Sequence, residues 1–261
     1  MAEESRTVHG IHPVLEALRA HPGDVERVYV LEGSVPPPAA EILSRARDAR
    51  VRVERVGRER LSALAEGGTH QGVAARLREF AYVTLEELLA RAKASGRPPL
   101  VVLLDGLQDP QNLGAILRSV DALGAHGVVL PRDRSVGVTA SVARASAGAV
   151  EHVPVARVTN LARALEELKA AGLWIAAADP GGDQLLWDAR LAGPLGVVVG
   201  AEGAGIRPGV LKHSDLRVRI PMGGRVASLN ASVSAAMVLY EVARQRAAAG
   251  VFALTPAKSV P

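Results

Sequence analysis

Apolar residues recur along this chain in two patterns, one typical of helices and one typical of strands. Residues 8–18 repeat apolar side chains at Ile11, Val14 and Leu18, which places them on one helix face. Residues 51–56, VRVERV, alternate as a half-buried strand does. A strand at 28–31, a helix at 39–49, a short helix in RLSALA and a strand after the glycine-rich turn EGGTHQGV complete this part. We predict a small α/β unit that ends near residue 78.

From residue 84 onward, predicted strands and helices alternate. Residues 84–94 open with Thr84 and Glu87, the spacing of a capping box. Further strands are expected at 101–107, 127–130, 152–158, 173–178, 195–199 and 216–221, and helices at 113–123, 139–147, 161–171 and 228–246. Nearly continuous apolar strands that alternate with helices favour a mostly parallel sheet covered on both faces. Ligands of such sheets bind beyond the carboxyl ends of the strands.

The expected organisation is therefore a domain at 1–78, a linker at 79–83, a larger α/β domain at 84–250 and a loose tail at 251–261. Hydrophobic residues make up 48% and charged residues 22% of the 261 residues, which excludes a mostly disordered chain. Cysteine is absent, which suits a reducing compartment. The sequence shows neither the apolar core of a signal peptide nor an apolar run of about 20 residues, so we expect a cytoplasmic protein without membrane association.

The net charge of +4 is compatible with a polyanionic partner. Before residue 80 we count twelve basic and twelve acidic residues, so the excess lies in the second part. The first part still contains a run rich in arginine, whose positive charge is partly balanced by three acidic residues. Its arginines are Arg45, Arg47, Arg50, Arg52, Arg55, Arg58 and Arg60, and its acids are Asp48, Glu54 and Glu59. One interpretation of this run is a phosphate-binding surface, because guanidinium groups fit phosphates. The other is a solvated face of the protein.

Three predicted strand ends carry polar or glycine-rich loops. In LLDGLQDPQNLGAILRSVDALG a strand ends at Asp105, and a helix begins near Asn112, a candidate N-cap. Arg118 of that helix is either an ordinary exposed arginine or lies at an apolar boundary, where it would need an anion or a carbonyl partner. In VVVGAEGAG the glycines permit positive φ angles, and Glu202 places a carboxylate where the strand meets the loop. The G-x-x-G-x-G spacing differs from the dinucleotide fingerprint.

The third segment, RIPMGGRVASLNASVSAAMVLYE, ends a strand at Pro221 and starts the last predicted helix. Ser228 or Asn230 is suited to cap that helix. Its small residues allow close approach of backbone or ligand, although a tightly packed core helix explains them equally. They are Ala231, Ser232, Ser234, Ala235 and Ala236. No metal is expected, because the seven histidines show no i,i+4 pair, and the sequence contains neither a nucleophile elbow nor a P-loop.

Together these segments resemble the motifs of the SpoU (TrmH-like) class of the SPOUT RNA 2′-O-ribose methyltransferases. The matching stretches, in order, are NLGAILRSVDALG, VVVGAEGAGI and IPMGGRVASLNASVSAAMVLYE. Residues VHGIHPVLEAL and GTHQGV are similar to the L30e-like RNA-binding domain of the bacterial 23S rRNA guanosine 2′-O-methyltransferases. The resemblance implies an α/β fold with a deep C-terminal trefoil knot, which general rules would not predict. It also implies a homodimer with active sites at the subunit interface, to which helix 228–246 would contribute.

The resemblance further implies S-adenosylmethionine as the cofactor. Gly200, Ile220 and Leu229 are then expected to contact it through the main chain, with Gly205, Met222 and Asn230 as neighbours. The implied reaction methylates a ribose 2′-hydroxyl in structured RNA, above all a guanosine of 23S rRNA. The residues expected around that hydroxyl are Asn112, Arg118, Glu202, Ser228 and Asn230.

Arg118 resists deprotonation, so we expect it to hold the neighbouring phosphate and to stabilise the developing alkoxide. Glu202 would orient Arg118 or a water molecule, and the two asparagines would fix the hydroxyl and the backbone. Alternatives are a tRNA or antibiotic-resistance methyltransferase, a non-catalytic RNA-binding assembly factor, and a nucleotide-dependent oxidoreductase. No DNA partner is expected.

Overall fold

The computed structural model describes residues 5–33, 37–226 and 228–252, which fall into two compact units. The first unit comprises residues 1–82, 109–118 and 136–153, and the second comprises 83–108, 119–135 and 154–261. The domain boundaries expected from the sequence stay a prediction, and the expected loose tail lies outside the described residues from position 253 onward.

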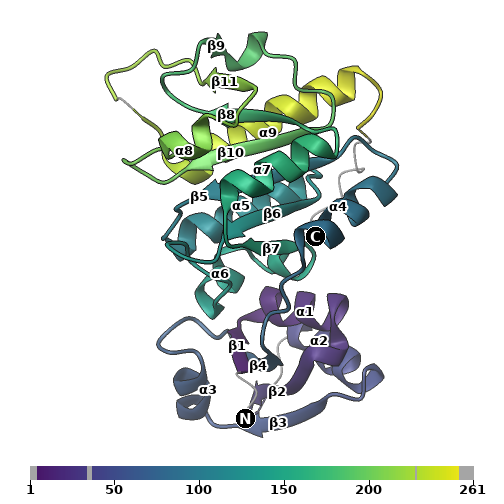
Figure 1. The fold of residues 1–261 in the computed structure, drawn as a ribbon. Helices are drawn as coiled ribbons and strands as arrows, with labels where there is room; N and C mark the ends of the chain where they lie inside the picture. The colour runs from purple at the N-terminus through teal and green to yellow at the C-terminus, as the bar shows by residue number, and fades with distance from the viewer. Residues whose placement is uncertain (1–4, 34–36, 227, 253–261) are drawn as a thin grey trace. The chain divides into compact units, whose positions relative to one another are not determined.

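The first unit is built on a four-stranded sheet of order β1-β4-β2-β3 (Figure 1). Its elements are β1 Ser5–His9, α1 Ile11–Ala20, η1 Pro22–Asp24, β2 Val25–Leu31, α2 Pro37–Asp48, β3 Arg52–Val56, α3 Arg58–Leu64 and β4 Val73–Arg78. It also contains α6 Ala140–Ala145, η2 Ala149–Glu151 and the first residues of α5 Pro110–Ala122. Helices α1 and α2 lie on one side of the sheet, and α3 lies on the other.

The first helix begins later than its apolar spacing predicts. Val8 and His9 belong to β1, where they pair with Ala75 and Ala74 of β4. Gly10 then turns the chain with a φ of 92°, a conformation that favours glycine. A helix start leaves amide groups without partners, and the Gln71 side chain accepts a hydrogen bond from the amide of Ile11 at 2.9 Å. The expected helix at 8–18 is therefore corrected to 11–20.

The second unit holds a seven-stranded sheet of order β7-β6-β5-β10-β8-β11-β9, in which every recorded pair is parallel. Its elements are α4 Leu85–Ala94, β5 Leu100–Asp105, β6 Gly127–Pro131, β7 Val155–Val158, α7 Leu161–Ala170, β8 Trp174–Ala178, β9 Gln184–Leu185, η3 Leu186–Asp188, β10 Leu195–Gly200, α8 Pro208–Leu211, β11 Leu216–Arg219 and α9 Ala231–Ala248. The mostly parallel α/β sheet predicted from the sequence is confirmed. The trefoil knot stays a prediction.

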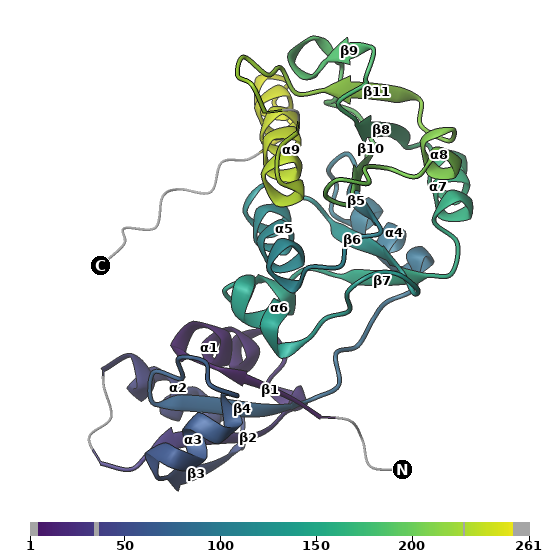
Figure 2. The same ribbon diagram turned by 90° about the vertical axis from the view of Figure 1, so that its left-hand side faces the viewer.

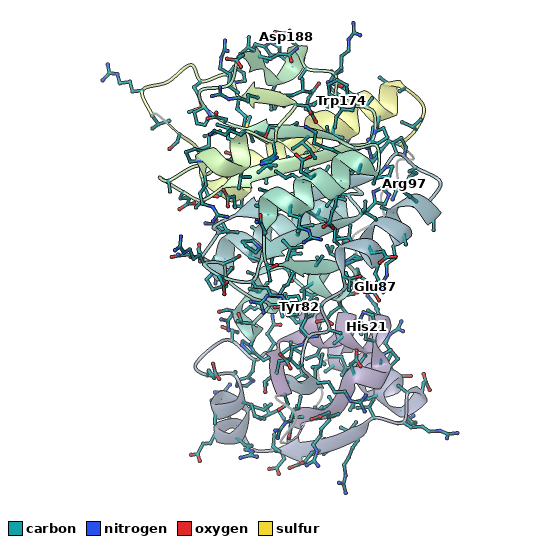
Figure 3. The ribbon with its side chains drawn as sticks, in the orientation of Figure 1. His21, Tyr82, Glu87, Arg97, Trp174 and Asp188 are labelled. Atoms are coloured by element: carbon teal, nitrogen blue, oxygen red, sulfur yellow. The ribbon has the colours of Figure 1, made fainter. Side chains whose placement is uncertain are left out.

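Helices cover both faces of this sheet. Helix α9 lies on one face, and α4 and α7 lie on the other (Figure 2). Leu88 of α4 and Leu165 of α7 are fully buried with Leu103 of β5 in one hydrophobic core cluster. The capping box that begins α4 is present, because Thr84 accepts from the Glu87 amide at 3.1 Å and Glu87 accepts from the Thr84 amide at 2.7 Å. Glu87 is labelled in Figure 3.

Several predicted boundaries change for local reasons. Helix α5 begins at Pro110 rather than near Asn112, and Asp109 accepts a hydrogen bond from the Gln111 amide at 2.9 Å. Proline suits the first helical position, so the interpretation of Asn112 as the N-cap is wrong. Strand β7 starts at Val155, because a 3₁₀ turn precedes it. In the described part of the chain, no helix is long and apolar enough to span a membrane.

Candidate functional site

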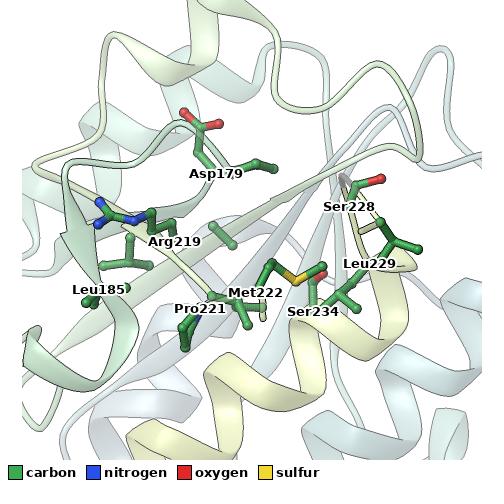
Figure 4. A pocket seen from close by; sticks show the side chains of 13 residues that line it. Asp179, Leu185, Arg219, Pro221, Met222, Ser228, Leu229 and Ser234 are labelled. Carbon is green, nitrogen blue, oxygen red and sulfur yellow. The ribbon is translucent and has the colours of Figure 1, made fainter. Parts of the chain in front are cut away.

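A pocket of about 440 Å³ opens in the second unit at the carboxyl ends of β8 and β11 (Figure 4). The loop after β11 and the first turn of α9 form its other walls. Its lining residues are Ala178, Asp179, Pro180, Leu185, Val218, Arg219, Ile220, Pro221, Met222, Val226, Ser228, Leu229 and Ser234. Ligand sites of open parallel sheets lie in this position.

Hydrogen bonds between strand ends fix the polar side of the pocket. Arg217 donates from Nη2 and Nε to Asp179 at 2.8 and 3.2 Å, and this contact raises the pKa of Arg217. Arg219 donates to the Gly182 carbonyl at 2.8 Å. A Cβ atom at Gly182 would lie 2.7 Å from the Arg217 carbonyl oxygen, so this close approach requires glycine. The turn after β8 is thereby held against β11.

The lining combines apolar side chains with a few polar groups. Leu185, Ile220, Val226 and Leu229 supply apolar surface, and Asp179, Ser228 and Ser234 supply carboxylate and hydroxyl oxygens (Figure 4). Apolar walls with a few placed polar groups are typical of sites for small organic molecules. An aromatic heterocycle with a ribose matches this chemistry.

The loop after β10 is folded tightly next to the neighbouring strand end. A Cβ atom at Gly200 would lie 2.2 Å from the carbonyl carbon of Gly205 and 2.4 Å from the amide nitrogen of Ile206. No side chain larger than hydrogen fits there. Gly203 and Gly205 have φ angles of 74° and 66°, which glycine adopts without strain. All three glycines are therefore required by the shape of this loop.

Asp105 at the end of β5 anchors the same loop. Its backbone carbonyl accepts from the Ala201 amide at 3.1 Å. Its buried carboxylate accepts from the backbone amide of Arg207 at 2.8 Å and from Nε of Arg207 at 2.7 Å. The sequence interpretation treated Asp105 only as a strand end. The sequence signal for this role is an acid that ends an otherwise apolar strand, whereas its register with Gly200 on the neighbouring strand appears only in the structure.

Glu202 and Asn230 connect the β10 loop to the start of α9. The Asn230 side-chain amide donates to the Glu202 carboxylate. The Asn230 side-chain oxygen accepts from the amides of Ser232 and Val233 at 2.9 and 3.3 Å, which makes Asn230 the N-cap of α9. The expected helix start at residue 228 is therefore corrected to Ala231.

The structure brings together part of the predicted set. Ile220, Met222, Ser228 and Leu229 line the pocket, and Glu202 and Asn230 are hydrogen-bonded to each other. Gly200 and Gly205 pack against one another beside β10 and are not part of the pocket lining.

Asn112 and Arg118 lie on α5 in the first unit, where Asn112 is buried and Arg118 is exposed. The roles of the predicted site residues stay predictions. Asp179, Arg207 and Ser234 were missed, because single polar residues without a repeating spacing give no signal. Across the described residues, no group of three His, Cys, Asp or Glu side chains is placed to hold a metal ion.

Two family models match the chain. The SpoU rRNA methylase family matches residues 99–240, and a model described as RNA 2′-O ribose methyltransferase substrate binding matches residues 7–83. The boundary between the two matches falls near the linker predicted from the sequence.

Relatives match along nearly the whole chain. A putative TrmH family tRNA/rRNA methyltransferase, YacO of Bacillus subtilis, is 39% identical over 94% of this chain and 98% of its own length. The 23S rRNA (guanosine-2′-O-)-methyltransferase RlmB of Neisseria meningitidis is 41% identical over 92% of this chain and 96% of its own.

Solved structures agree with these relatives. One is the SpoU methyltransferase AviRb of Streptomyces viridochromogenes, which was solved in complex with the cofactor AdoMet. It superposes with a TM-score of 0.78 at 28% sequence identity, and the match covers 94% of this chain and 91% of the AviRb chain. A structure described as an RNA 2′-O ribose methyltransferase has a TM-score of 0.77 at 30% identity and covers 94% and 90%. The order of motifs, the parallel sheet and the relatives lead to one conclusion: this chain belongs to the SpoU rRNA methylase family.

Proposed function

We propose that this protein transfers a methyl group from S-adenosylmethionine to a ribose 2′-hydroxyl of RNA. The pocket at the ends of β8 and β11 carries this proposal, because its apolar walls and few polar side chains suit an adenosine moiety. A guanosine of 23S rRNA is the proposed target, in keeping with the RlmB relatives. The proposed place of action is the cytoplasm, where ribosomal RNA is available.

The residues that would hold the cofactor are on three segments. The backbone of Ile220, Met222 and Leu229 would bind the adenine and ribose. Gly200 and Gly205 would keep the β10 loop in the shape that accepts the methionine part of the cofactor. S-adenosylmethionine supplies a methyl group activated by a sulfonium. The protein then has to align the acceptor oxygen and assist loss of its proton.

The side chains proposed for the acceptor are Asn112, Arg118, Glu202, Ser228 and Asn230. Arg118 would bind the phosphate next to the target ribose and stabilise negative charge that develops on the 2′-oxygen, because a guanidinium stays protonated. The hydrogen bond between Glu202 and Asn230 keeps that carboxylate at the N-terminus of α9. Ser228 adds a hydroxyl on the pocket wall.

A homodimer is part of the proposal. The outer side of α9 and the neighbouring 3₁₀ turn expose large apolar side chains: Trp187 at 58%, Val233 at 46%, Met237 at 41% and Tyr240 at 64%. These residues surround a second hollow of about 490 Å³ that also includes Pro221. Exposed apolar patches of this kind are typical of protein–protein interfaces. A second copy of the chain fits, because a two-fold interface pairs a patch with itself.

The experiment that tests the proposed function blocks the pocket. Ser234→Phe places a ring in the pocket, and Ser62→Phe places the same ring on exposed α3. Binding of S-adenosylmethionine is measured by calorimetry, and methyl transfer to 23S rRNA and tRNA transcripts is measured with tritiated cofactor. We expect Ser234→Phe to weaken binding by about a hundredfold and Ser62→Phe to bind normally. A wild-type protein that binds no cofactor would overturn the proposal, and methylation of tRNA alone would overturn the rRNA assignment.

A further inference from the structure

The sheet of the first unit presents arginines on the face that α3 covers only in part. At one end of this face, Leu61 of α3 clusters with Tyr29, Val56 and Ala74. At the other end stand Arg27 of β2, Arg52 of β3 and Arg76 of β4, which we call the arginine row. The Arg27 and Arg76 side chains are 37% and 52% exposed, and Arg52 is also exposed.

The strand register places these three arginines side by side. Arg27 pairs with Arg52 on one neighbouring strand and with Arg76 on the other. Strands β2 and β4 are antiparallel, and directly opposed residues of such a pair have Cβ atoms about 4.5–5.5 Å apart, where like charges destabilise a sheet. Strands β2 and β3 are parallel, and their register also makes Arg27 and Arg52 neighbours. Arg27 therefore stands between two cations that repel it.

The nearby acids neutralise only part of this charge. Arg27 donates to Glu54 at 2.6 Å, and Arg76 lies 3.5 Å from Glu26 while its Nε donates to Ser5 at 2.7 Å. Within the described part of the chain, Arg52 has no ion pair. Arg78, two residues after Arg76 on β4, is also exposed and lies on the same face. Four arginines of this face thus meet two acids, Glu54 and Glu26.

Protection of a sheet edge does not explain the arginine row. Charged side chains on an edge strand prevent unwanted pairing between sheets, and β3 is an edge strand of this sheet. Arg27 and Arg76, however, lie on β2 and β4, which are both interior strands. Repulsion inside a sheet serves no folding purpose, so the row points to a ligand with closely spaced negative charges.

We propose that the arginine row binds the sugar–phosphate backbone of the RNA substrate. This proposal rests on the proposed function and adds to it a surface of the first unit that holds the RNA. Guanidinium groups bind phosphate oxygens in a bidentate manner. Each phosphate contact releases counterions, so binding through the row weakens steeply as salt rises.

The test compares two triple variants of the full chain with equal loss of charge. The row variant carries Arg27→Gln, Arg52→Gln and Arg76→Gln. The control variant carries Arg91→Gln, Arg163→Gln and Arg190→Gln, all exposed positions of the second unit. Filter binding to a 23S rRNA transcript is measured across a series of KCl concentrations, together with thermal melting and calorimetric binding of S-adenosylmethionine.

We expect the row variant to bind RNA at least about tenfold more weakly, with a salt slope smaller by roughly two to three. Its melting temperature should not fall, because the substitutions remove like-charge repulsion. Should the row variant fail to fold, Arg52→Gln alone should reduce the slope by about one. An unchanged slope in the row variant, or an equal reduction in the control variant, overturns the proposal. Methyl transfer is scored separately, so an inactive wild type counts against the proposed function and not against the row.

Discussion

Asp105 accepts two hydrogen bonds from Arg207, one from its backbone amide at 2.8 Å and one from its Nε at 2.7 Å. The Asp105 side chain is fully buried, whereas the Arg207 side chain is 49% exposed. Through this contact the end of β5 determines where the loop after β10 returns to the sheet. Because that loop contains Gly200, Gly205 and Glu202, the pair positions three residues of the predicted site without lining the pocket.

Asp105→Asn should therefore loosen the loop. The substitution keeps the shape of the side chain but removes the charge that both donors use. Hydrogen bonds to a charged group contribute about 1.5–3 kcal/mol, and Arg207 is partly screened by solvent. We expect the free energy of unfolding to fall by about 2 kcal/mol and binding of S-adenosylmethionine to weaken. Urea denaturation and calorimetry measure the two effects. The same change at exposed Asp188 should leave both unchanged, and an unaffected Asp105→Asn variant would show that the loop holds its shape without the pair.

Gly200→Ala tests the close approach of the two sides of that loop. The added methyl group would lie 2.2–2.4 Å from backbone atoms of Gly205 and Ile206, which cannot move as a side chain can. Overpacking of this kind destabilises by about 1–3 kcal/mol. Gly209→Ala is the matched control, since nothing lies within 4 Å of its added Cβ. There we expect a gain of about 0.5–1 kcal/mol, because alanine favours the helix. Equal stability of the two variants in urea denaturation would contradict the clash.

Much of the second unit could be predicted from the sequence. Strands β5 and β6 are buried at every position, so apolar runs such as that of β5 stand out from their surroundings. The capping box at Thr84 was found because it depends on residues three apart. By contrast, β9 has two residues and α8 has four, too few to show a period.

The site was predictable only where the motifs were contiguous. The resemblance pointed to Ile220, Met222 and Leu229, which share the pocket wall. Asp179 lies about forty positions earlier and reaches the same wall because β8 and β11 are paired neighbours. Strand order is a property of the whole sheet, so local spacing does not reveal it. The repulsive arrangement of Arg27, Arg52 and Arg76 likewise appears only once the register is known.

Arg118→Ala tests the residue proposed to act on the acceptor. If Arg118 stabilises charge on the 2′-oxygen, methyl transfer should fall by about 10²–10³-fold. Binding of S-adenosylmethionine should stay within about twofold of the wild type, because the proposed contacts of the cofactor are backbone groups on other segments. Single-turnover methylation and calorimetry separate the two quantities. Arg163→Ala, at another exposed helix position, is the control. Normal turnover by Arg118→Ala would remove Arg118 from the mechanism.

Tyr240→Glu tests the proposed dimer. Tyr240 is 64% exposed beside Met237 and Trp187, and a carboxylate at its position would be desolvated by a second copy of the same patch. We expect a monomer by light scattering at concentrations where the wild type is a dimer. Trp174→Glu changes an equally exposed apolar residue, at 60%, that does not line this hollow. A monomeric wild type would contradict the proposed dimer, and a dimeric Tyr240→Glu variant would exclude this patch as its interface.

His126 should make the stability of the second unit depend on pH. Its Nδ1 accepts from the Leu100 amide at 2.9 Å, and its Nε2 lies 2.9 Å from the Ser95 hydroxyl, which donates to the Ala92 carbonyl. These partners require the neutral ring, since a proton on Nδ1 would face the N–H of Leu100. Burial, followed by the charges of Arg97 and Arg246, lowers the pKa of His126 to about 4.

The unfolded chain therefore binds a proton at His126 as the pH falls below about 6.5, while the folded chain does so only near pH 4. The contribution of His126 to the free energy of unfolding is fully present above pH 6.5 and is lost progressively as the pH falls to 4. The loss amounts to roughly 2 kcal/mol after allowance for solvent screening. We expect His126→Gln to be less stable than the wild type at pH 7 and to lose less stability between pH 7 and 4. Urea denaturation at each pH gives both curves, with exposed His12→Gln as the control. Parallel curves for His126→Gln and the wild type would show that another group carries the acid sensitivity.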